Sequence, residues 1–347
     1  MLVFLLAHLL LHASGGERSP CRRSAARSIS GAPYALTAAD ATALCAVHDP
    51  SLVEEAGVLY VLGTDAGSPP SPPLLRLRSS ADGGRTWSTR GAVFSALPRW
   101  VAEAVPLATA VWAPDASSLL PRVDGWAVYY AVSSFGSSVS AIGLVTTPSL
   151  AAPTWTDRGL VLASSAASPY NAVDPALVAD ADGALWLVFG SFWSGIHAVR
   201  IDAATGLVDA RNSSAVPLAR RAAPDALEGA FLVVRPDAHY LFLSWDYCCR
   251  GVHSNYSVHV GRSLAGIQGP YYDRAGLALL DGGGSLLIGG GNGWAAGGGP
   301  GFLRSSTRAS SNLSTMVLHA YDGESGDPFL QLVDVGWGVD GWPRVLS

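Results

Sequence analysis

The amino-acid sequence predicts an all-β fold, namely a five-bladed β-propeller with the active site in its central channel. A hairpin pattern recurs along the chain with separations of 66, 59, 54 and 74 residues, and such a period in strand-rich sequence is typical of large propeller blades. The 39 Gly and 22 Pro suit many tight turns between short strands. Helical periodicity is nearly absent, which disfavours parallel α/β folds.

Each copy of the repeat has the same layout. An acidic residue beside Pro or Gly comes first, a short apolar strand follows, and a turn such as Asp182-Gly183 leads into a second strand with alternating large apolar residues. Two packed sheets are the structural alternative, but they would not repeat one hairpin five times. The copies begin at His48, Trp112, Val173, Leu227 and, in a weaker form, Gly299.

The N-terminal residues predict a secreted protein. Residues 2–12 are an apolar run of signal-peptide length that is too short to span a membrane. We therefore expect a signal peptide over 1–15, a low-complexity leader over 16–39 and the propeller over 40–347. Three glycosylation sequons agree with the secretory route and begin at Asn212, Asn255 and Asn312.

The composition excludes several classes of protein and binding partner. Only 14% of the residues are charged and 11 Trp are present, so the chain is not intrinsically disordered. A net charge of −5 gives no electrostatic basis for binding nucleic acid or an anionic membrane. We expect a monomer with neither of these partners.

The four cysteines do not have the spacing of metal ligands, so a zinc site is not expected. Two of them, Cys248 and Cys249, are adjacent. They are compatible with a disulfide between neighbours and equally with two small residues in a strand. The other two are Cys21 and Cys45.

Four copies of the repeat carry an acidic residue near their start, at Asp49, Asp115, Asp174 and Glu228. The first strand of a propeller blade lines the central channel, so these carboxylates are expected to meet near one axis. Like charges in a partly dry pocket separate their pKa values, so one carboxyl stays protonated while another stays ionised. Cleavage of a glycosidic bond needs such a pair. The Trp residues offer flat apolar faces for sugar rings, although core packing explains most of them.

Short motifs follow one another in a specific order from about residue 44 to the C-terminus. They are His48-Asp49-Pro50, Trp112-Ala-Pro-Asp115, Phe135-Gly-Ser-Ser-Val-Ser-Ala-Ile-Gly143, Tyr170-Asn-Ala-Val-Asp174-Pro, Phe189-Gly-Ser-Phe-Trp-Ser-Gly195, Leu227-Glu228-Gly, Asp246-Tyr-Cys-Cys-Arg-Gly251, Val260-Gly-Arg-Ser263 and Gly341-Trp-Pro343. In order and spacing they resemble the family 43 glycoside hydrolases and, within them, the endo-1,5-α-L-arabinanases.

This resemblance implies hydrolysis of internal α-1,5-L-arabinofuranosidic bonds in arabinan, with inversion at the anomeric carbon. By position, Asp49 resembles the general base that activates water, and Glu228 the general acid that protonates the leaving oxygen. Asp174 resembles the third carboxylate, which orients the acid and keeps its pKa raised. Asp115 fits a turn or supporting role better. The positions that resemble substrate-binding residues are His48, Trp112, Phe135, Asn171 and Ser191.

The last blade departs from the family pattern. Members of the family usually carry Gly-Pro-Gly-His there, with the His coordinating calcium or a similar ion, whereas this chain has Gly299-Pro300-Gly301-Phe302. Phe cannot ligate a metal, and His319 matches a different position on a later strand. The sequence therefore requires no cofactor, and the calcium site of the family is in doubt. The expected ligand is arabinan or an arabino-oligosaccharide.

Three alternatives remain open. Ser80-Ala-Asp-Gly-Gly-Arg-Thr-Trp87 fits the aspartate-box turn of sialidases, but one box is a common β-turn, and the Arg triad and Tyr nucleophile of those enzymes cannot be placed. An arabinofuranosidase or xylosidase of the same family would often act from chain ends. A propeller that lost catalysis would bind carbohydrate without cleaving it, although all three carboxylates are retained.

Overall fold

The computed structural model describes residues 37–38, 44–65, 74–305 and 313–346. The expected signal peptide over 1–15 and most of the expected 16–39 leader lie outside the described residues, as do Cys21 and Asn312.

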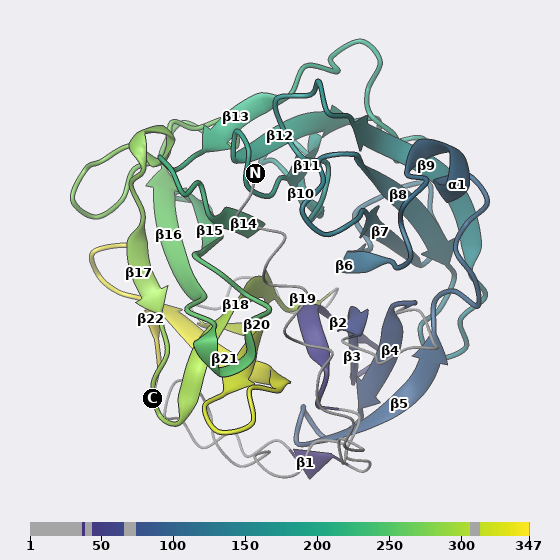
Figure 1. Cartoon of the computed structure of the whole chain (residues 1–347), viewed down its shortest axis with the longest axis horizontal. Coiled ribbons are helices and arrows are strands. Elements are labelled where there is room, and N and C mark those ends of the chain that lie inside the picture. Colours follow the sequence, from purple (N-terminus) through teal and green to yellow (C-terminus); the bar gives the residue numbers. More distant parts are fainter. Residues whose placement is uncertain (1–36, 39–43, 66–73, 306–312, 347) are drawn as a thin grey trace.

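The described residues form five β-sheets that surround a central axis as blades (Figure 1), so the predicted propeller is confirmed. Blade 1 contains β2 (Val47–Glu55), β3 (Val58–Asp65), β4 (Arg76–Ser80) and β5 (Thr86–Ala92). Blade 2 contains β6 (Trp112–Ser117), β7 (Trp126–Val132), β8 (Ser140–Thr147) and β9 (Thr156–Ser164). Blade 3 contains β10 (Ala176–Ala179), β11 (Leu185–Phe189), β12 (Ile196–Ile201) and β13 (Val216–Ala219). Blade 4 contains β14 (Leu227–Val234), β15 (His239–Trp245), β16 (Ser257–Ser263) and β17 (Ser285–Ile288), and blade 5 contains β18 (Trp294–Phe302), β20 (Leu313–Asp322), β21 (Pro328–Trp337) and β22 (Pro343–Val345).

Two short strands extend blade 1. β1 (Thr37–Ala38) pairs in parallel with β5, and β19 (Arg304–Ser305), which follows β18 of blade 5, pairs in parallel with β2. A further link between the first and last blades is the hydrogen bond from the Leu330 amide to the Leu44 carbonyl, at 2.9 Å. The ring is therefore closed by backbone contacts between its two ends.

Helical structure is limited to short connections between strands. The described helices are α1 (Val101–Ala104) and the 3-10 turns η1 (Gly251–His253) and η2 (Leu279–Asp281). Among the residues that the structure describes, none of these has the length and apolar character of a membrane span.

The innermost strand of every blade is kinked at the same place. Bulges interrupt the pairing of β2, β6, β14 and β18, and in blade 3 the kink lies just before β10. At each kink one residue has a φ between 43° and 64°, in the left-handed region. These bulge residues are Asp49, Ala113, Asp174, Gly229 and Gly299. They line the central channel together with the two residues that follow each of them, because a bulge bends its strand and redirects the local side chains.

Apolar side chains fill the wedges between neighbouring blades. Tyr60 and Leu62 of blade 1 belong to one buried cluster with Trp126 and Val128 of blade 2. Similar clusters join blades 2 and 3 and blades 3 and 4, and the largest joins blades 1, 4 and 5. Because complete burial of one such side chain stabilises a fold by roughly 1.5–3 kcal/mol, these wedges hold the blades at fixed positions around the channel.

The aspartate-box segment is a turn between β4 and β5. Asp82 Oδ1 accepts hydrogen bonds from the amides of Arg85 and Thr86 at 3.0 and 2.9 Å. Trp87 is buried, and its indole N–H donates to the Gly84 carbonyl at 2.9 Å. These contacts account for the motif as a structural turn of blade 1.

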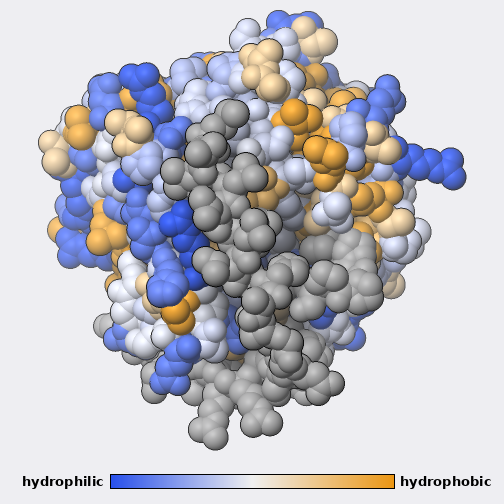
Figure 2. Space-filling model, viewed as in Figure 1, coloured by the Kyte–Doolittle hydropathy of each residue, from blue (hydrophilic) through white to orange (hydrophobic). Residues whose placement is uncertain are grey.

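Hydrophilic and hydrophobic residues are interspersed over the described surface in Figure 2. The most exposed large apolar side chains are separate from one another along the chain and are Leu107, Phe135, Leu264 and Val339 in loops and Leu286 in β17. Asn212 and Asn255, the two described sequon asparagines, are both exposed. Both are therefore accessible to modification.

Candidate active site

The structure corrects the alignment of the four repeat acids. Asp49 and Asp174 are bulge residues, whereas Glu228 lies one residue before the bulge of blade 4 and Asp115 lies two residues after the bulge of blade 2. Two residues of strand span about 7 Å, so Asp115 lies further along the channel. The sequence pattern missed this offset because a hairpin repeat does not show where its strands bulge.

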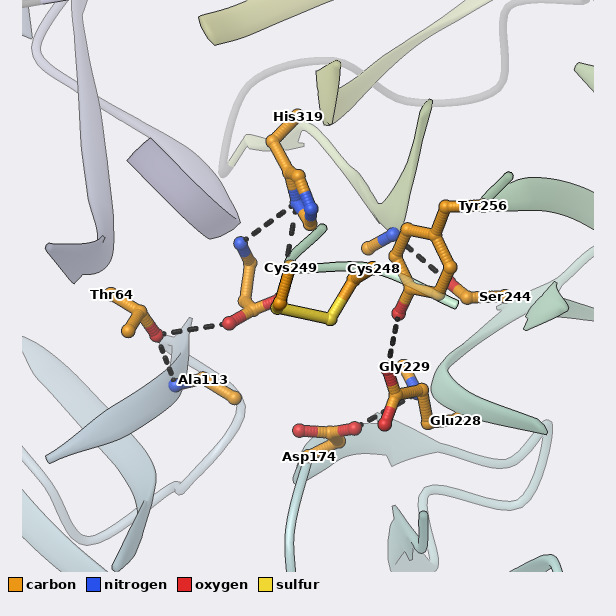
Figure 3. Close-up of polar contacts among 12 residues, drawn as sticks. Thr64, Ala113, Asp174, Glu228, Gly229, Ser244, Cys248, Cys249, Tyr256 and His319 are labelled. Carbon is orange, nitrogen blue, oxygen red and sulfur yellow. Dashed lines mark hydrogen bonds and ion pairs between the residues drawn. A yellow bond between two sulfur atoms is a disulfide. The ribbon is translucent and has the colours of Figure 1, made fainter. Parts of the chain in front are cut away.

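Two hydroxyl groups hold the carboxylate of Glu228. Ser191 Oγ donates to its Oε2 at 2.7 Å. Tyr256 Oη donates to its Oε1 at 3.0 Å, and Figure 3 shows this second contact. Burial raises the pKa of Glu228, and these two hydrogen bonds oppose the rise. A hydroxyl can donate to a carboxylate or accept from a protonated carboxyl. Both partners therefore suit a group that changes its protonation state.

Asp174 lies beside Glu228 (Figure 3), and its Oδ2 accepts a hydrogen bond from the Gly229 amide at 3.0 Å. Burial raises the pKa of Asp174 well above its ordinary value, and the charges of Glu228 and Asp49 add to the rise. Neighbouring carboxylates in a buried site do not both ionise easily. The pair therefore retains a proton at a pH at which an exposed carboxyl has lost it.

Asp49 reaches the same site from blade 1. Thr64 Oγ1 donates to its Oδ2 at 3.0 Å, and its backbone N–H donates to His319 Nδ1 at 3.1 Å. Burial raises the pKa of Asp49 to about 7, the charge of Glu228 contributes to the rise, and the Thr64 hydrogen bond opposes it. The side chain of Asp49 is 32% exposed. Water in the channel can therefore reach this carboxylate.

The two imidazoles beside Asp49 are uncharged near neutral pH. His319 Nδ1 accepts the Asp49 amide hydrogen, which assigns the ring hydrogen to Nε2, 3.3 Å from Tyr321 Oη. Burial lowers the pKa of His319 well below its usual range, and His48 adds to the effect. The His48 ring lies 4.8 Å from that of His319, and burial lowers the pKa of His48 to about 4. Neither ring therefore neutralises the acids.

The backbone amides of four bulge residues tie neighbouring blades together around the channel. Each donates to a side chain of the preceding blade, with donor–acceptor distances of 2.7–3.1 Å. The pairs, with the amide first, are Asp49 with His319, Ala113 with Thr64, Gly229 with Asp174 and Gly299 with Ser244. Several of the same side chains thus position both the backbone and the acids (Figure 3).

The three acids form a cluster that can hold and transfer protons. Within the part of the chain that the structure describes, no Arg lies at ion-pair distance from Asp49, Asp174 or Glu228. Their mutual repulsion and burial keep one carboxyl protonated while another is ionised. Such a cluster can protonate one oxygen atom and deprotonate another in the same reaction.

Asp115 has a different environment from these three. Its Oδ2 accepts from Arg304 Nη1 at 2.8 Å and from the Leu177 amide at 2.7 Å. Arg304 also donates to the carbonyls of Ala116 and Leu177 at 2.9 and 2.6 Å. Burial raises the pKa of Asp115, and the Arg304 guanidinium opposes the rise. This ion pair joins blades 2 and 3 to the crossing strand β19.

The structure places the predicted substrate-binding residues in several environments. Ser191 contacts Glu228, and His48 and Trp112 lie immediately before the bulges of blades 1 and 2. Asn171 is buried and its Oδ1 accepts from Ser140 Oγ at 2.6 Å, so that oxygen is used within the fold. Phe135 is 64% exposed in the turn between β7 and β8.

The sequence analysis did not assign roles at the site to Thr64, Tyr256 or His319. Thr64 and His319 have a recognisable origin, since they pair across the strand with His48 and Gly298, the residues before the bulges of their blades. Once the bulge positions are known, the pairing of the two strands in each hairpin is therefore sufficient to predict that these two residues lie at the site. Tyr256 lies in the loop before β16, and no sequence pattern indicates its contact with the acid.

The residues of the last blade do not fit a histidine-ligated ion. Phe302 is buried, with its ring 4.7 Å from that of Phe242 and 5.7 Å from that of Phe231. An aromatic hydrocarbon ring offers no metal-donor atom. Across the described ranges, no group of three or more His, Cys, Asp and Glu side chains is arranged to hold a metal.

Comparisons with known proteins match almost the whole propeller. Residues 45–343 match the model of the glycosyl hydrolases family 43. The chain is 38% identical over 299 residues to the extracellular endo-α-(1→5)-L-arabinanase 1 of Bacillus subtilis, covering 86% of this chain and 87% of that protein. It is 33% identical to the extracellular exo-α-(1→5)-L-arabinofuranosidase ArbA of Cellvibrio japonicus, covering 86% of each. The solved family 43 endo-arabinanase of Bacillus licheniformis superposes with a TM-score of 0.76 and 38% identity, over 86% of this chain and 97% of that one.

Proposed function

This chain belongs to family 43 of the glycosyl hydrolases, and from that membership we propose that it is a secreted, monomeric endo-1,5-α-L-arabinanase. Its substrate is arabinan or an arabino-oligosaccharide, and it hydrolyses internal α-1,5-L-arabinofuranosidic bonds. The observation that carries the proposal is the half-buried cluster of Asp49, Asp174 and Glu228, with raised pKa values, in a chain 38% identical to an endo-arabinanase. Extracellular relatives support the proposed location.

In the proposed reaction, Glu228 is the general acid. Its carboxyl donates a proton to the glycosidic oxygen as the bond to the anomeric carbon breaks. Ser191 and Tyr256 hold both of its oxygens, which fixes the direction of proton transfer. Asp174 lies beside it, and the charge of Glu228 helps to raise the pKa of Asp174, so this pair of adjacent carboxyls retains a proton.

Asp49 is the general base on the other side of the sugar ring. It removes a proton from a water molecule that attacks the anomeric carbon, so the configuration at that carbon inverts. Thr64 and His319 hold its side chain and backbone, and its partial exposure leaves room for water. After the reaction, Asp49 carries the proton taken from water and Glu228 has lost one, and exchange with solvent restores both.

The proposal is tested on debranched arabinan. We expect reducing ends to appear at once and the first products to be a range of oligosaccharides, because internal bonds are cut. Chromatography of the products at early times measures this, with Glu228→Gln as the inactive control. Release of arabinose or one short product from the start would instead indicate an exo-acting enzyme. Binding of arabino-oligosaccharides in calorimetry without any cleavage would indicate a carbohydrate-binding propeller.

A further inference from the structure

Cys248 and Cys249 form a disulfide between adjacent residues, which decides between the two possibilities left open by the sequence. They lie in the loop between β15 and β16 rather than in a strand. Figure 3 shows the disulfide between His319 on one side and Tyr256 on the other. Cys249 is exposed and Cys248 is half-buried.

One side of the disulfide leads to the proposed base. The Cys249 amide donates to Tyr321 Oη at 3.0 Å, and that hydroxyl donates to Cys249 Sγ at 3.7 Å. Tyr321 Oη lies 3.3 Å from His319 Nε2, and His319 Nδ1 accepts the amide hydrogen of Asp49. A continuous path of three hydrogen-bonded contacts therefore joins Cys249 to the backbone of Asp49.

The other side of the disulfide leads to the proposed acid. Cys248 packs against the buried cluster formed by Tyr256, Ala296 and Tyr321. Tyr256 is 2% exposed, and its hydroxyl donates to Glu228 Oε1 at 3.0 Å. Cys248 therefore packs against the same small cluster that holds this phenol ring.

The base of this loop has hydrogen bonds of its own. Tyr247 and Asn255 exchange two of them, from the Tyr247 amide to Asn255 Oδ1 and from the Asn255 amide to the Tyr247 carbonyl, both at 3.1 Å. Ser254 Oγ accepts from the Arg250 amide, also at 3.1 Å. Opening the disulfide is therefore expected to loosen the tip of the loop, which carries Cys248 and Cys249. The base of the loop, at Tyr247 and Asn255, is expected to stay in place.

We propose that the Cys248–Cys249 disulfide is a positioning element for both proposed catalytic carboxylates, acting on Asp49 through Tyr321 and His319 and on Glu228 through Tyr256. This inference rests on the proposed function. Chemistry at both carboxylates depends on their placement, and a displacement of about 1 Å costs up to roughly 100-fold in rate. The disulfide thus acts on the catalytic step without forming part of it.

The test compares the oxidised protein, the protein treated with dithiothreitol, and the variant Cys248→Ala/Cys249→Ala. Dithiothreitol breaks the S–S bond, each cysteine gains one electron and one proton, and the dithiol becomes a cyclic disulfide. On debranched arabinan we expect kcat to fall about 10- to 100-fold after reduction and in the variant. KM is expected to change less than about twofold, because the displaced groups act in the transition state.

Two controls isolate this disulfide. Cys45 is also disulfide-bonded, so dithiothreitol is added to the Cys248→Ala/Cys249→Ala variant as well, and no further loss of kcat is expected there. Tyr321→Phe keeps the ring and removes only the hydroxyl, which cuts the path to Asp49. This variant should lose part of kcat and respond less to the reductant. If the double alanine variant fails to fold, Cys45→Ala is compared with and without dithiothreitol instead, because the Cys45 disulfide then no longer contributes to the response.

Unchanged kcat and pH profile after reduction would overturn the proposal. So would a rise in KM with kcat unchanged, which would indicate direct contact between the disulfide and the sugar. If the oxidised protein releases no reducing ends from debranched arabinan, the proposed function is wrong. The positioning role of the disulfide is then tested by a measurement that needs no substrate. That measurement is the melting temperature of the oxidised and reduced proteins between pH 4 and 8.

The raised pKa of Asp49 determines the direction in which the melting temperature is expected to change with pH. In the oxidised protein, the contribution of Asp49 to stability is expected to be lost as the pH rises from 3.8 toward about 7. A loosened tip admits water and lowers the pKa of Asp49, so the loss should end at a lower pH after reduction. Identical pH dependences would overturn the positioning role. The other titratable groups around Asp49 are His48, Asp174, Glu228, Tyr256, His319 and Tyr321.

Discussion

The central channel holds two groups of acids, one half-buried and one buried, that differ in their partners. Asp49, Asp174 and Glu228 meet with neutral imidazoles, hydroxyl groups and amides around them. Asp115, further along the channel, meets the guanidinium of Arg304 at 2.8 Å. Burial raises the pKa of all four carboxyls, but a cation opposes the rise only at Asp115.

This difference in partners separates the proposed proton-transferring acids from a structural one, which is also more deeply buried and lies two residues beyond the bulge of its strand. An acid next to a guanidinium stays ionised and fixes its neighbours in place. An acid surrounded by hydroxyls and other carboxyls can gain and lose a proton near neutral pH. The same residue type thus serves two purposes within one ring of strands.

The largest expected effect is the loss of activity when an acid that lacks a cationic partner among the described residues is replaced. Asp49→Asn and Glu228→Gln should each lower kcat on debranched arabinan by about 1,000-fold, since general acid–base catalysis contributes roughly 100- to 10,000-fold. Asp174→Asn should lower kcat by about 100-fold, because Asp174 acts indirectly, through the proposed acid Glu228. Asn also tolerates the left-handed backbone of the two bulge positions. Circular dichroism checks that the fold is retained.

Asp115→Asn is the matched control for this prediction. It makes the same chemical change in the same channel, but at the acid paired with Arg304. We expect its kcat to stay within about threefold of wild type, which reducing-sugar assays at 25 °C can measure. Near wild-type turnover in folded Asp49→Asn or Glu228→Gln would remove the proposed roles of those residues.

The next largest effect is on stability, at the Asp115–Arg304 ion pair. Arg304→Met leaves a buried carboxylate without its cation, and breaking such a pair costs about 3–5 kcal/mol. The side chains of Asp115 and Arg304 are only 5% and 18% exposed, so water compensates little. Urea denaturation should show a lower free energy of unfolding in Arg304→Met, largely recovered in Asp115→Asn/Arg304→Met. Equal loss in the single and double variants would show that the ion pair is not the cause.

A smaller effect is expected on the pH dependence of stability. A carboxyl whose pKa is raised in the folded state contributes stability below its ordinary pKa and loses it as the pH rises through the folded value. For Asp49 this window runs from 3.8 to about 7. Asp49→Asn lacks this titration, so its melting temperature should fall less than that of wild type across the window. Parallel curves for the two proteins would mean that the pKa of Asp49 is not raised.

Activity should show the opposite trend over the same window. Asp49 must be ionised to accept a proton from water, so kcat/KM of the wild type should rise as the pH increases toward about 7. A rate profile that is flat from pH 4 to 7, measured at constant ionic strength, would exclude Asp49 as the base.

The sequence predicted the propeller and its five blades because hydrophobic alternation and turn residues mark each hairpin. The sequence also predicted that Asp49, Asp174 and Glu228 meet in one channel. It did not reveal that Glu228 and Asp115 are offset from the bulge residues, since a bulge is set by local backbone angles and tertiary pairing. Contacts from distant loops, such as Tyr256 to Glu228, have no local signal at all.

The smallest effect is expected from removing divalent metal. The family resemblance implies an ion in the last blade, but here Phe302 packs against Phe231 and Phe242. In the described channel, the guanidinium of Arg304 is a fixed positive charge bound to Asp115. We therefore propose that activity does not depend on calcium, and that EDTA changes kcat by less than about twofold and leaves the melting temperature unchanged. Loss of activity in EDTA that calcium restores, with bound calcium measured by mass spectrometry, would show that other groups hold an ion despite Phe302.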